Sequence, residues 1–445
     1  MQKVFIDNEN FLHYYFTMNE NYWKNKWSKE QIKVILLEQA HNFWQLDTGI
    51  ERDQLAVVER SLGSPHAVII SGLRRAGKST LLSQMAHKLG EDNYYYLNFE
   101  DERFLDFSVD EANYLYQVLV EVFGERNIFI LDEIQNVTGW ERFVRRFMDM
   151  GFKFFITGSN ASLLSRELGS RLTGRYLPIE LFPFSFKEFT KFKNYHIPDI
   201  PPLTTLEQAK LERYLGEYLQ LGGLPEPLKY PGLPLHRTLY DDVLYRDIAT
   251  RYHIEEVRAL KELGYYLISN PASHISFNKL KENLKLGSVN TVKNYVEYLK
   301  NSWLIFIVNV FDYSVKRQQI APKIIYFIDT GLVNSIGFQF SPNTGRLMEN
   351  LVFLGLRRNT DNIYYYAADS GYEVDFYLPE TRQLIQVAQN INQTQTMERE
   401  IRALVEAMET LQLDEALVLS ESSQPLLQID NKTIKFQAIS DWLLA

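Results

Sequence analysis

A short run of apolar and β-branched residues, 67–71, is followed by a glycine-rich stretch and then by a helical pattern. That pattern has one apolar face, made by Leu81, Leu82, Met85 and Leu89, and Gly90 follows it as a stop signal. Four further segments have the composition of buried strands, at 94–100, 128–131, 152–157 and 175–182. Helical patterns lie between them, so we predict an α/β fold with a five-stranded, parallel, doubly wound sheet.

The glycine-rich stretch, ISGLRRAGKSTLLSQM, contains the motif G-x-x-x-x-G-K-[ST], with Gly72, Gly77, Lys78 and Ser79 at its fixed positions. Glycines let backbone N–H groups surround phosphate oxygens at a helix N-terminus, the lysine reaches the β and γ phosphates, and the serine hydroxyl ligates Mg²⁺. A flexible Gly/Lys turn is the alternative. The strand before the motif and the helix after it favour a site for ATP and Mg²⁺, with Thr80 in the binding set.

The strand at 128–131 ends in two acids, Asp132 and Glu133. Ligands of open α/β sheets bind at the carboxyl ends of strands, so we assign Asp132 to Mg²⁺ and Glu133 to the attacking water. A solvated charge at a strand end is the alternative for Glu133. The next strand ends at Ser159 and Asn160, and both are candidates to contact the γ-phosphate or to position water. We assign this role to Asn160, with a helix cap as the competing interpretation.

Residues 256–330 have a helix–turn–helix outline followed by two strands, which is typical of a winged helix. Gly287 makes the turn, Ser288 can cap the second helix, and residues 312–322 would form the wing. Exposed positions of the second helix and the wing carry Lys293, Asn294, Lys316 and Arg317. This pattern favours DNA contact, with the helix in the major groove and the wing on phosphates. A lid or protein-contact module with a solvated lysine face is the alternative.

The bulk composition excludes several other classes of protein. The 445 residues contain no cysteine, and the eight histidines show no H-x-x-x-H pair, so neither disulfides nor a zinc site is expected. The net charge of −9 requires any nucleic-acid contact to come from a local basic surface. No apolar run approaches the roughly 18–20 residues that span a bilayer, and the polar N-terminus is no signal peptide. We therefore expect a cytoplasmic protein without a membrane partner.

The order of these motifs resembles the AAA+ class of ATPases from about Ser64 to about Phe189. The stretches that carry the resemblance are the glycine-rich loop, ILDE at 130–133, TGSN at 157–160 and GSRLTGRYLPIEL at 169–181. The resemblance implies a homo-oligomer in which an arginine just before the last strand reaches the neighbouring subunit's site. Arg175 occupies that position and Arg171 is the second choice, while a surface arginine or an internal ion pair is the alternative.

The chain after Phe182 is similar to a group of prokaryotic ATPases that pair this core with a C-terminal domain of uncharacterised function. The matching stretches include LGGLPE at 221–226, YRDI at 245–248, IIYFIDTGL at 324–332, LMENLVF at 347–353 and EVDF at 373–376. LGGLPE also resembles an element of signalling ATPases in which a helical lid presents proline to the adenine. That resemblance implies an adenine contact for Pro225, with Gly223 allowing close approach, and an ordinary loop is the alternative.

The last segment resembles the PD-(D/E)xK nuclease core, with Glu349 on a helix and Asp375 on a strand. Such nucleases use two acids for Mg²⁺ and a lysine at the scissile phosphate. The third element here is Gln386, Val387 and Ala388, so both the lysine and one carboxylate are missing. We expect a restriction-endonuclease-like α/β fold without cleavage activity.

Together these patterns predict a P-loop NTPase of AAA+ type with five parts: an N-terminal helical extension (1–63), the ATPase core (64–190), a helical lid (191–255), a winged helix (256–330) and a nuclease-like domain (331–445). The predicted function is an oligomeric Mg²⁺-dependent ATPase that couples ATP to DNA binding or remodelling. A nucleotide-driven signalling or assembly switch and an ATP-dependent nuclease are the alternatives.

Overall fold

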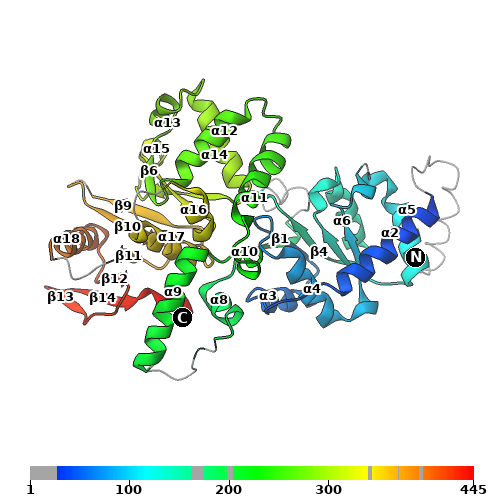
Figure 1. The fold of residues 1–445 in the computed structure, drawn as a ribbon, viewed down its shortest axis with the longest axis horizontal. Helices are drawn as coiled ribbons and strands as arrows, with labels where there is room; N and C mark the ends of the chain where they lie inside the picture. The colour runs from blue at the N-terminus through cyan, green and yellow to red at the C-terminus, as the bar shows by residue number, and fades with distance from the viewer. Residues whose placement is uncertain are drawn as a thin grey trace, which may run out of the picture.

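The computed structural model describes residues 28–105, 107–161, 172, 174–195, 197, 204–338, 343–368, 370–389 and 394–445. These residues form two sheets, one in an N-terminal part (28–180) and one in a C-terminal part (181–445), which lie side by side (Figure 1). Arg171 and the first 27 residues lie outside the described residues.

The sheet of the N-terminal part has five parallel strands in the order β2-β3-β4-β1-β5. The strands are β1 (Ala67–Ser71), β2 (Tyr95–Asn98), β3 (Ile128–Asp132), β4 (Lys153–Gly158) and β5 (Tyr176–Glu180). This confirms the predicted parallel α/β sheet, strand for strand. Because every strand runs the same way, the carboxyl ends of β1, β3 and β4 meet at one edge, which faces the C-terminal part (Figure 1).

Helices cover both faces of this sheet. They are α2 (Lys29–Trp44), α3 (Leu55–Arg60), α4 (Lys78–Leu89), α5 (Ala112–Phe123) and α6 (Trp140–Asp149), with short 3₁₀ turns at 61–63, 91–93, 102–104, 109–111 and 134–136. One core contains apolar residues of α2, α5 and α6, and the other contains residues of α3 and α4. A capping box between Ser28 and Gln31 starts α2. Residues 28–63, which are the described portion of the predicted N-terminal extension, therefore pack against the five-stranded sheet.

The C-terminal part begins with helices and continues into a mixed α/β region. Its helices are α8 (Phe186–Phe192), α9 (Thr205–Leu221), α10 (Pro225–Lys229), α11 (Leu235–Asp242), a π-helix (Val243–Thr250), α12 (Val257–Ile268), α13 (Phe277–Asn283), α14 (Val289–Asn301), α15 (Val315–Ile320), α16 (Thr330–Ile336), α17 (Thr344–Arg357), α18 (Thr394–Leu411) and α19 (Ile439–Leu444). Capping boxes begin α8 at Ser185 and α9 at Thr204, and Ser288 caps α14 as expected.

Nine strands form the second sheet, in the order β13-β14-β12-β11-β10-β9-β7-β8-β6. They are β6 (Ser273–Ile275), β7 (Ile305–Val310), β8 (Lys323–Phe327), β9 (Tyr364–Ala367), β10 (Glu373–Leu378), β11 (Gln383–Ala388), β12 (Glu415–Ser420), β13 (Leu427–Ile429) and β14 (Lys432–Ala438). Two features differ from the predicted layout. The parallel pairing of β7 with β9 joins residues 256–330 and 331–445 in one sheet, and the predicted wing contains the helix α15.

Apolar packing also connects the two parts of the molecule. Leu73 and Ala76 of the glycine-rich loop are fully buried and belong to the core of the C-terminal part, together with Phe182 and Phe184. The short helix α10 lies where the two parts meet (Figure 1). The glycine-rich loop is therefore enclosed from both sides. Among the described residues, no helix combines the length and the apolar character needed to cross a membrane.

Candidate functional site

The glycine-rich loop, residues 72–79, connects β1 to α4 and borders a cavity of about 600 Å³. Gly77 has a φ of +96°, which a side chain would strain, and it directly precedes the first residue of α4. Gly72 is needed for packing, because a Cβ atom there would overlap the carbonyl oxygen of Leu181. The loop contributes Arg74, Arg75, Gly77, Lys78 and Ser79 to the cavity wall, and Thr80 of α4 follows them.

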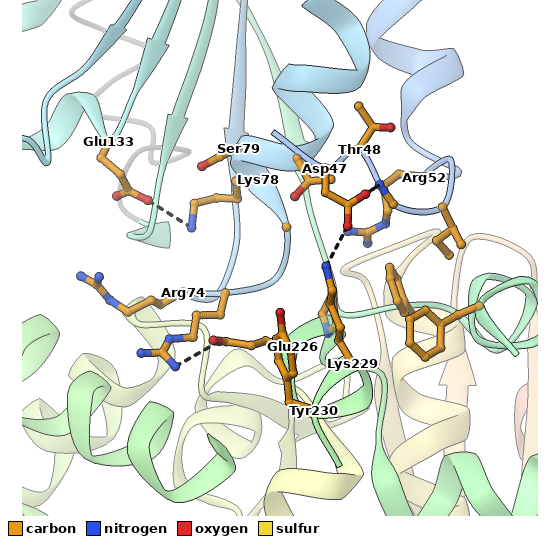
Figure 2. A pocket seen from close by; sticks show the side chains of 18 of the residues that line it. Asp47, Thr48, Arg52, Arg74, Lys78, Ser79, Glu133, Glu226, Lys229 and Tyr230 are labelled. Atoms are coloured by element: carbon orange, nitrogen blue, oxygen red, sulfur yellow. Dashed lines mark hydrogen bonds and ion pairs between the residues drawn. The ribbon is translucent and has the colours of Figure 1, made fainter. Parts of the chain in front are cut away.

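Lys78 and Glu133 form an ion pair inside this cavity (Figure 2). Nζ of Lys78 lies 3.4 Å from Oε1 of Glu133 and donates hydrogen bonds to the carbonyl oxygens of Gly72 and Leu73. Burial opposes ionisation of Glu133, but the charge of Lys78 and a hydrogen bond from Gln135 outweigh it, so the pKa of Glu133 is lowered. Glu133 is therefore ionised at neutral pH, as a group that polarises water must be.

Asp132 ends β3 next to the loop serine and is buried. Its carboxylate accepts hydrogen bonds from Ser79, Thr157 and Tyr96. Burial and the negative charge of Glu133 raise the pKa of Asp132, and a bound cation would offset both effects. A carboxylate beside a hydroxyl is a donor set that suits Mg²⁺, so the residues present fit the predicted metal.

Ser159 and Asn160 follow β4 at the same edge of the sheet and are buried. The backbone carbonyl of Asn160 accepts a hydrogen bond from the Ser71 hydroxyl at 2.8 Å. Nε2 of Gln135 lies 3.5 Å from Oγ of Ser159 and also donates to Glu133. The structure thus places both residues beside the loop and Glu133, while neither belongs to the described residues that line the cavity.

Arg175 lies at the other end of the sheet. Its carbonyl oxygen pairs with the amide of Ala67 at the start of β1, whereas the loop follows the end of β1. Five residues of strand separate these ends by roughly 15 Å. The guanidinium of Arg175 is 2.8 Å from the carboxylate of Asp149 and is 37% exposed. Arg175 is therefore remote from its own chain's loop and lies on the surface.

The C-terminal part supplies the opposite wall of the cavity (Figure 2). Pro225 is the first residue of α10 and lines the cavity, as do Phe184 and Tyr230. A Cβ atom at Gly223 would overlap the carbonyl oxygen of Phe184, so glycine is needed there for packing of the backbone, and the adenine contact stays a prediction. The buried carboxylate of Asp329 accepts a hydrogen bond from the Gly223 amide at 2.6 Å and holds this turn in place.

Sequence reasoning missed a buried arginine that supports the loop. Arg52 donates to the carbonyl oxygen of Ala76 at 2.8 Å and to that of Phe182 at 2.7 Å, and it pairs with Glu188 at 2.9 Å. Both charged side chains are 2% exposed. The capping signal of Glu188 is visible in the sequence, but nothing near Arg52 indicates that it crosses to another segment. The loop at Asp47–Ile50, which also lines the cavity, was missed for the same reason.

Two arginines at the variable positions of the glycine-rich loop form ion pairs with the C-terminal part. Arg74 pairs with Asp247 of the π-helix at 3.0 Å and with Glu100 at 2.8 Å. Arg75 pairs with Glu226 at 3.0 Å and with Asp242 at 3.3 Å. These contacts join the loop directly to the LGGLPE and YRDI stretches.

A second cavity, of about 460 Å³, lies among the residues that resemble a nuclease site. Glu349 accepts a hydrogen bond from Tyr326, and Asp375 accepts one from the amide of Val387. Gln386, which replaces the expected carboxylate, donates to Glu400 at 2.6 Å. Among the described residues, no group of three or more His, Asp or Glu side chains is arranged to hold a metal ion.

The buried acids of this second cavity should make the stability of the fold depend on pH. Burial raises the pKa of Glu349 to about 7 and that of Asp375 well above its usual value. A carboxyl whose pKa is raised by folding stabilises the fold while it is protonated, and this stability is lost as pH rises from about 4.5 to 7. The free energy of unfolding of Glu349→Gln, compared with that of the wild type, should therefore increase by on the order of 3 kcal/mol from pH 5 to pH 8. Denaturant unfolding at the two pH values measures this difference. The exposed Glu409→Gln on α18 should show no such gain, and an equal gain in both variants would contradict the assignment.

The residues assigned to DNA are exposed, but they do not form the expected wing. Lys293 and Asn294 lie on α14, and Lys316 and Arg317 lie on α15. Arg317 pairs with Asp312 at 3.1 Å. Burial and the charge of Lys293 lower the pKa of Lys323 on β8, which places these cations near one another.

Comparisons with known families match two segments of the chain. Residues 64–190 match the AAA domain family, and residues 212–343 match a domain of unknown function, DUF8612. The glycine-rich loop therefore belongs to an AAA-type P-loop nucleotide-binding domain.

The chain is also similar to curated proteins over most of its length. It is 37% identical over 391 residues to the uncharacterized protein MJ1544 of Methanocaldococcus jannaschii, covering 84% of this chain and 87% of that protein. It is 30% identical over 339 residues to an uncharacterized protein of Haemophilus influenzae, covering 72% and 81%.

Two solved structures show distant similarity. The Aeropyrum pernix Orc1 protein, solved in complex with DNA, is 12% identical with a TM-score of 0.29, covering 66% of this chain and 95% of that chain. A signal transduction ATPase with numerous domains, PH0952 from Pyrococcus horikoshii, is 14% identical with a TM-score of 0.27, covering 71% and 46%.

Proposed function

The chain belongs to the same family as MJ1544 of Methanocaldococcus jannaschii and its Haemophilus influenzae relative, and from that premise we propose that it is a Mg²⁺-dependent ATPase. One observation carries this proposal: the loop ammonium of Lys78 and the ionised carboxylate of Glu133 face each other at 3.4 Å in a cavity large enough for a nucleotide. Ser79 and Asp132 lie at the same edge.

Each residue has a distinct role in the proposed reaction. The loop amides and Lys78 bind the β and γ phosphates, and the Lys78 ammonium exchanges part of its contact with Glu133 for phosphate oxygens. Mg²⁺ held by Ser79 and Asp132 would neutralise phosphate charge. Glu133 orients a water molecule and accepts its proton as the water attacks the γ-phosphorus. Asn160 supports this geometry, and Pro225 gives the adenine an apolar surface on the lid side.

The direct test of the proposal is phosphate release from ATP by the purified full-length protein. We expect turnover with Mg²⁺ and a loss of turnover when EDTA removes it. Tight ATP binding without phosphate release would support a nucleotide-driven switch instead. Absence of both binding and turnover would refute the proposed function.

We also propose that Arg175 completes the site of a neighbouring subunit, since it lies on the surface and remote from its own loop. Arg175→Ala should lower kcat by at least about 100-fold, because a guanidinium on the γ-phosphoryl group contributes that much or more. Mixing this variant with Lys78→Ala should restore part of the activity, because one protomer lends Arg175 and the other lends an intact loop. Arg213→Ala, an exposed arginine on α9, is the control. Full activity of Arg175→Ala as a monomer would end this assignment.

A coupling of ATP turnover to DNA is favoured by the exposed cations Lys293 on α14 and Lys316 and Arg317 on α15. DNA should raise the ATPase rate, and a variant with Lys293, Lys316 and Arg317 changed to Gln should lose that stimulation. Three lost phosphate contacts should reduce the slope of log affinity against log salt by about 2.7. The exposed Lys210→Gln on α9 should behave as the wild type. If DNA leaves the rate unchanged while ATP changes the assembly state, the switch is the better description.

Cleavage of nucleic acid is not part of the proposal. The lysine expected after Gln386 is absent. Glu349 accepts a hydrogen bond from Tyr326, Asp375 accepts one from the Val387 amide, and Gln386 donates to Glu400. A binding module with a nuclease-like arrangement is the function that these contacts support.

A further inference from the structure

The variable positions of the glycine-rich loop carry an arginine that the proposed reaction does not yet use. Arg74 lies one residue after the buried Leu73 and lines the nucleotide cavity together with Lys78, Ser79 and Glu133. Its side chain is 19% exposed. Figure 2 shows it on the side of the cavity where Glu133 lies.

Two carboxylates bind this guanidinium. Nε and Nη2 of Arg74 donate to the two oxygens of Asp247 at 3.2 and 3.0 Å, and Nη1 donates to Glu100 at 2.8 Å. Glu133 lines the same cavity, and Figure 2 shows Arg74 extending on its side. Arg74 therefore lies on the side of the cavity that holds the proposed water-activating carboxylate.

The guanidinium still has donors available. An arginine has five N–H groups, and the hydrogen bonds to Asp247 and Glu100 use three of them. One N–H on each terminal nitrogen is left to donate to phosphate oxygens. The described contacts therefore hold the side chain in place without saturating it.

Arg75 has a different position, although it follows directly in the loop. Its guanidinium pairs with Glu226 and Asp242, on the side of α10 and α11. Arg75 also lines the cavity, but both of its carboxylate partners belong to the helices at 225–242. Arg74 instead extends on the side of the cavity where Glu133 lies (Figure 2), which is where we expect the terminal phosphate.

We propose that Arg74 is a further catalytic residue, which contacts the γ-phosphoryl oxygens of ATP bound in the same chain and stabilises the charge that develops on them. The inference rests on the proposed ATPase function. A guanidinium at this position acts in cis, in addition to the Arg175 contributed in trans, and is worth about 100-fold or more in rate when its donors meet transition-state charge.

Asp247 is the positioning residue for Arg74. It is 4% exposed, lies on the π-helix of the C-terminal part and holds Arg74 by two parallel hydrogen bonds. The fork geometry fixes the plane of the guanidinium as well as its distance. Hydrolysis therefore requires the π-helix to remain in contact with the loop. A movement of the C-terminal part would change kcat by breaking the ion pair between Asp247 and Arg74.

Steady-state hydrolysis by the full-length protein tests this proposal. Arg74→Lys keeps the charge but loses the fork, and should lower kcat by about 100-fold while KM changes by less than about threefold. Asp247→Asn should lower kcat by about tenfold at unchanged KM, and Asp247→Glu should recover part of the loss. Arg357→Lys is the matched control, because Arg357 also joins the two parts of the molecule, through Glu180 at 2.6 Å, but does not line the cavity. It should keep the wild-type kcat.

Two further measurements separate a catalytic role from a structural one. Mixing Arg74→Lys with Lys78→Ala should restore no activity, in contrast to the Arg175 mixture, because Arg74 and the loop it serves lie on one chain. ADP with aluminium fluoride should bind the wild type more tightly than ADP alone, and Arg74→Lys should lose this difference while still binding ADP.

The outcomes distinguish the catalytic role of Arg74 from the ATPase function on which it rests. A wild-type protein that binds but does not hydrolyse ATP would overturn the ATPase function, and this inference with it. A wild-type protein that hydrolyses ATP at a rate that Arg74→Lys matches would overturn this inference alone. A raised KM at unchanged kcat in Arg74→Lys would do the same, since it would make Arg74 a ground-state binding residue.

Discussion

Glu133→Gln should bind ATP as the wild type does and should lose at least about 100-fold in kcat, because the neutral amide cannot accept the proton of the attacking water. The substitution keeps the side chain's size and its acceptor oxygen, so the hydrogen bond from Gln135 can persist. It also removes a carboxylate that competes with phosphate for Lys78. ATP affinity should therefore stay equal or rise, which a fluorescent ATP analogue and single-turnover phosphate release would measure together.

The control for this variant is Glu125→Gln, an exposed glutamate just before β3, the strand that carries Glu133 at its other end. It should leave both affinity and kcat unchanged. A Glu133→Gln protein that turns over ATP at the wild-type rate would remove Glu133 from the reaction.

Lys78→Ala should weaken ATP binding by at least about 100-fold, which corresponds to about 3 kcal/mol. The buried ammonium is a charge-assisted donor to the β and γ phosphates, and such contacts are roughly twice as strong as neutral ones. Its removal also leaves Glu133 without its counter-ion, so a carboxylate would face the incoming phosphates. Isothermal titration with a non-hydrolysable ATP analogue measures this loss.

Lys88→Ala is the matched control for Lys78→Ala, since it makes the same substitution near the other end of α4. Lys88 is 53% exposed and pairs with Glu59 on the surface. It should bind the analogue as tightly as the wild type. Equal binding by Lys78→Ala would mean that the triphosphate is held elsewhere.

The sequence was most informative where local pattern and chemistry coincide. The strand before Gly72, the helix after Gly77 and the acids after β3 can be read from hydrophobic periodicity and motif spacing, and the structure brings Lys78, Ser79, Asp132 and Glu133 to one edge. The parallel sheet then follows, because strands separated by helices can meet that edge only if they run the same way.

The residues that the sequence did not reveal act over long separations in the chain. Arg52 supports the loop through Ala76 and pairs with Glu188, 136 positions away. Arg74 pairs with Asp247, 173 positions away. Such pairs depend on how two parts of a molecule dock, and a single sequence carries no signal for this beyond the presence of opposite charges.

In the C-terminal part, too, the sequence did not indicate how distant segments pair. Periodicity identified the helices around Gly287 and the strands around residues 305–310 and 323–327, but it did not indicate that β7 pairs with β9. Strand pairing between distant segments leaves no trace in local pattern. The wing was expected from two strands and a polar connection, and the connection VKRQQI has helix-forming residues that make α15.

These contacts give the glycine-rich loop a second role besides phosphate binding. Leu73 and Ala76 pack in the C-terminal core, Ser71 accepts a hydrogen bond from the buried Trp303 at 2.9 Å, and Arg74 pairs with the π-helix. A change at the phosphates therefore has direct contact with the C-terminal part. We therefore expect ATP binding to be coupled to the arrangement of that part through the loop itself.

The central claim is that this loop holds the triphosphate between the two parts of the molecule, and a crystal structure with a non-hydrolysable ATP analogue and Mg²⁺ tests it most directly. The account predicts the β and γ phosphates on the loop amides and Lys78, the metal between Ser79 and Asp132, and Arg74 within hydrogen-bond distance of the terminal phosphate. An analogue bound with its phosphates away from Lys78, or a cavity that stays empty at saturating analogue, would contradict it.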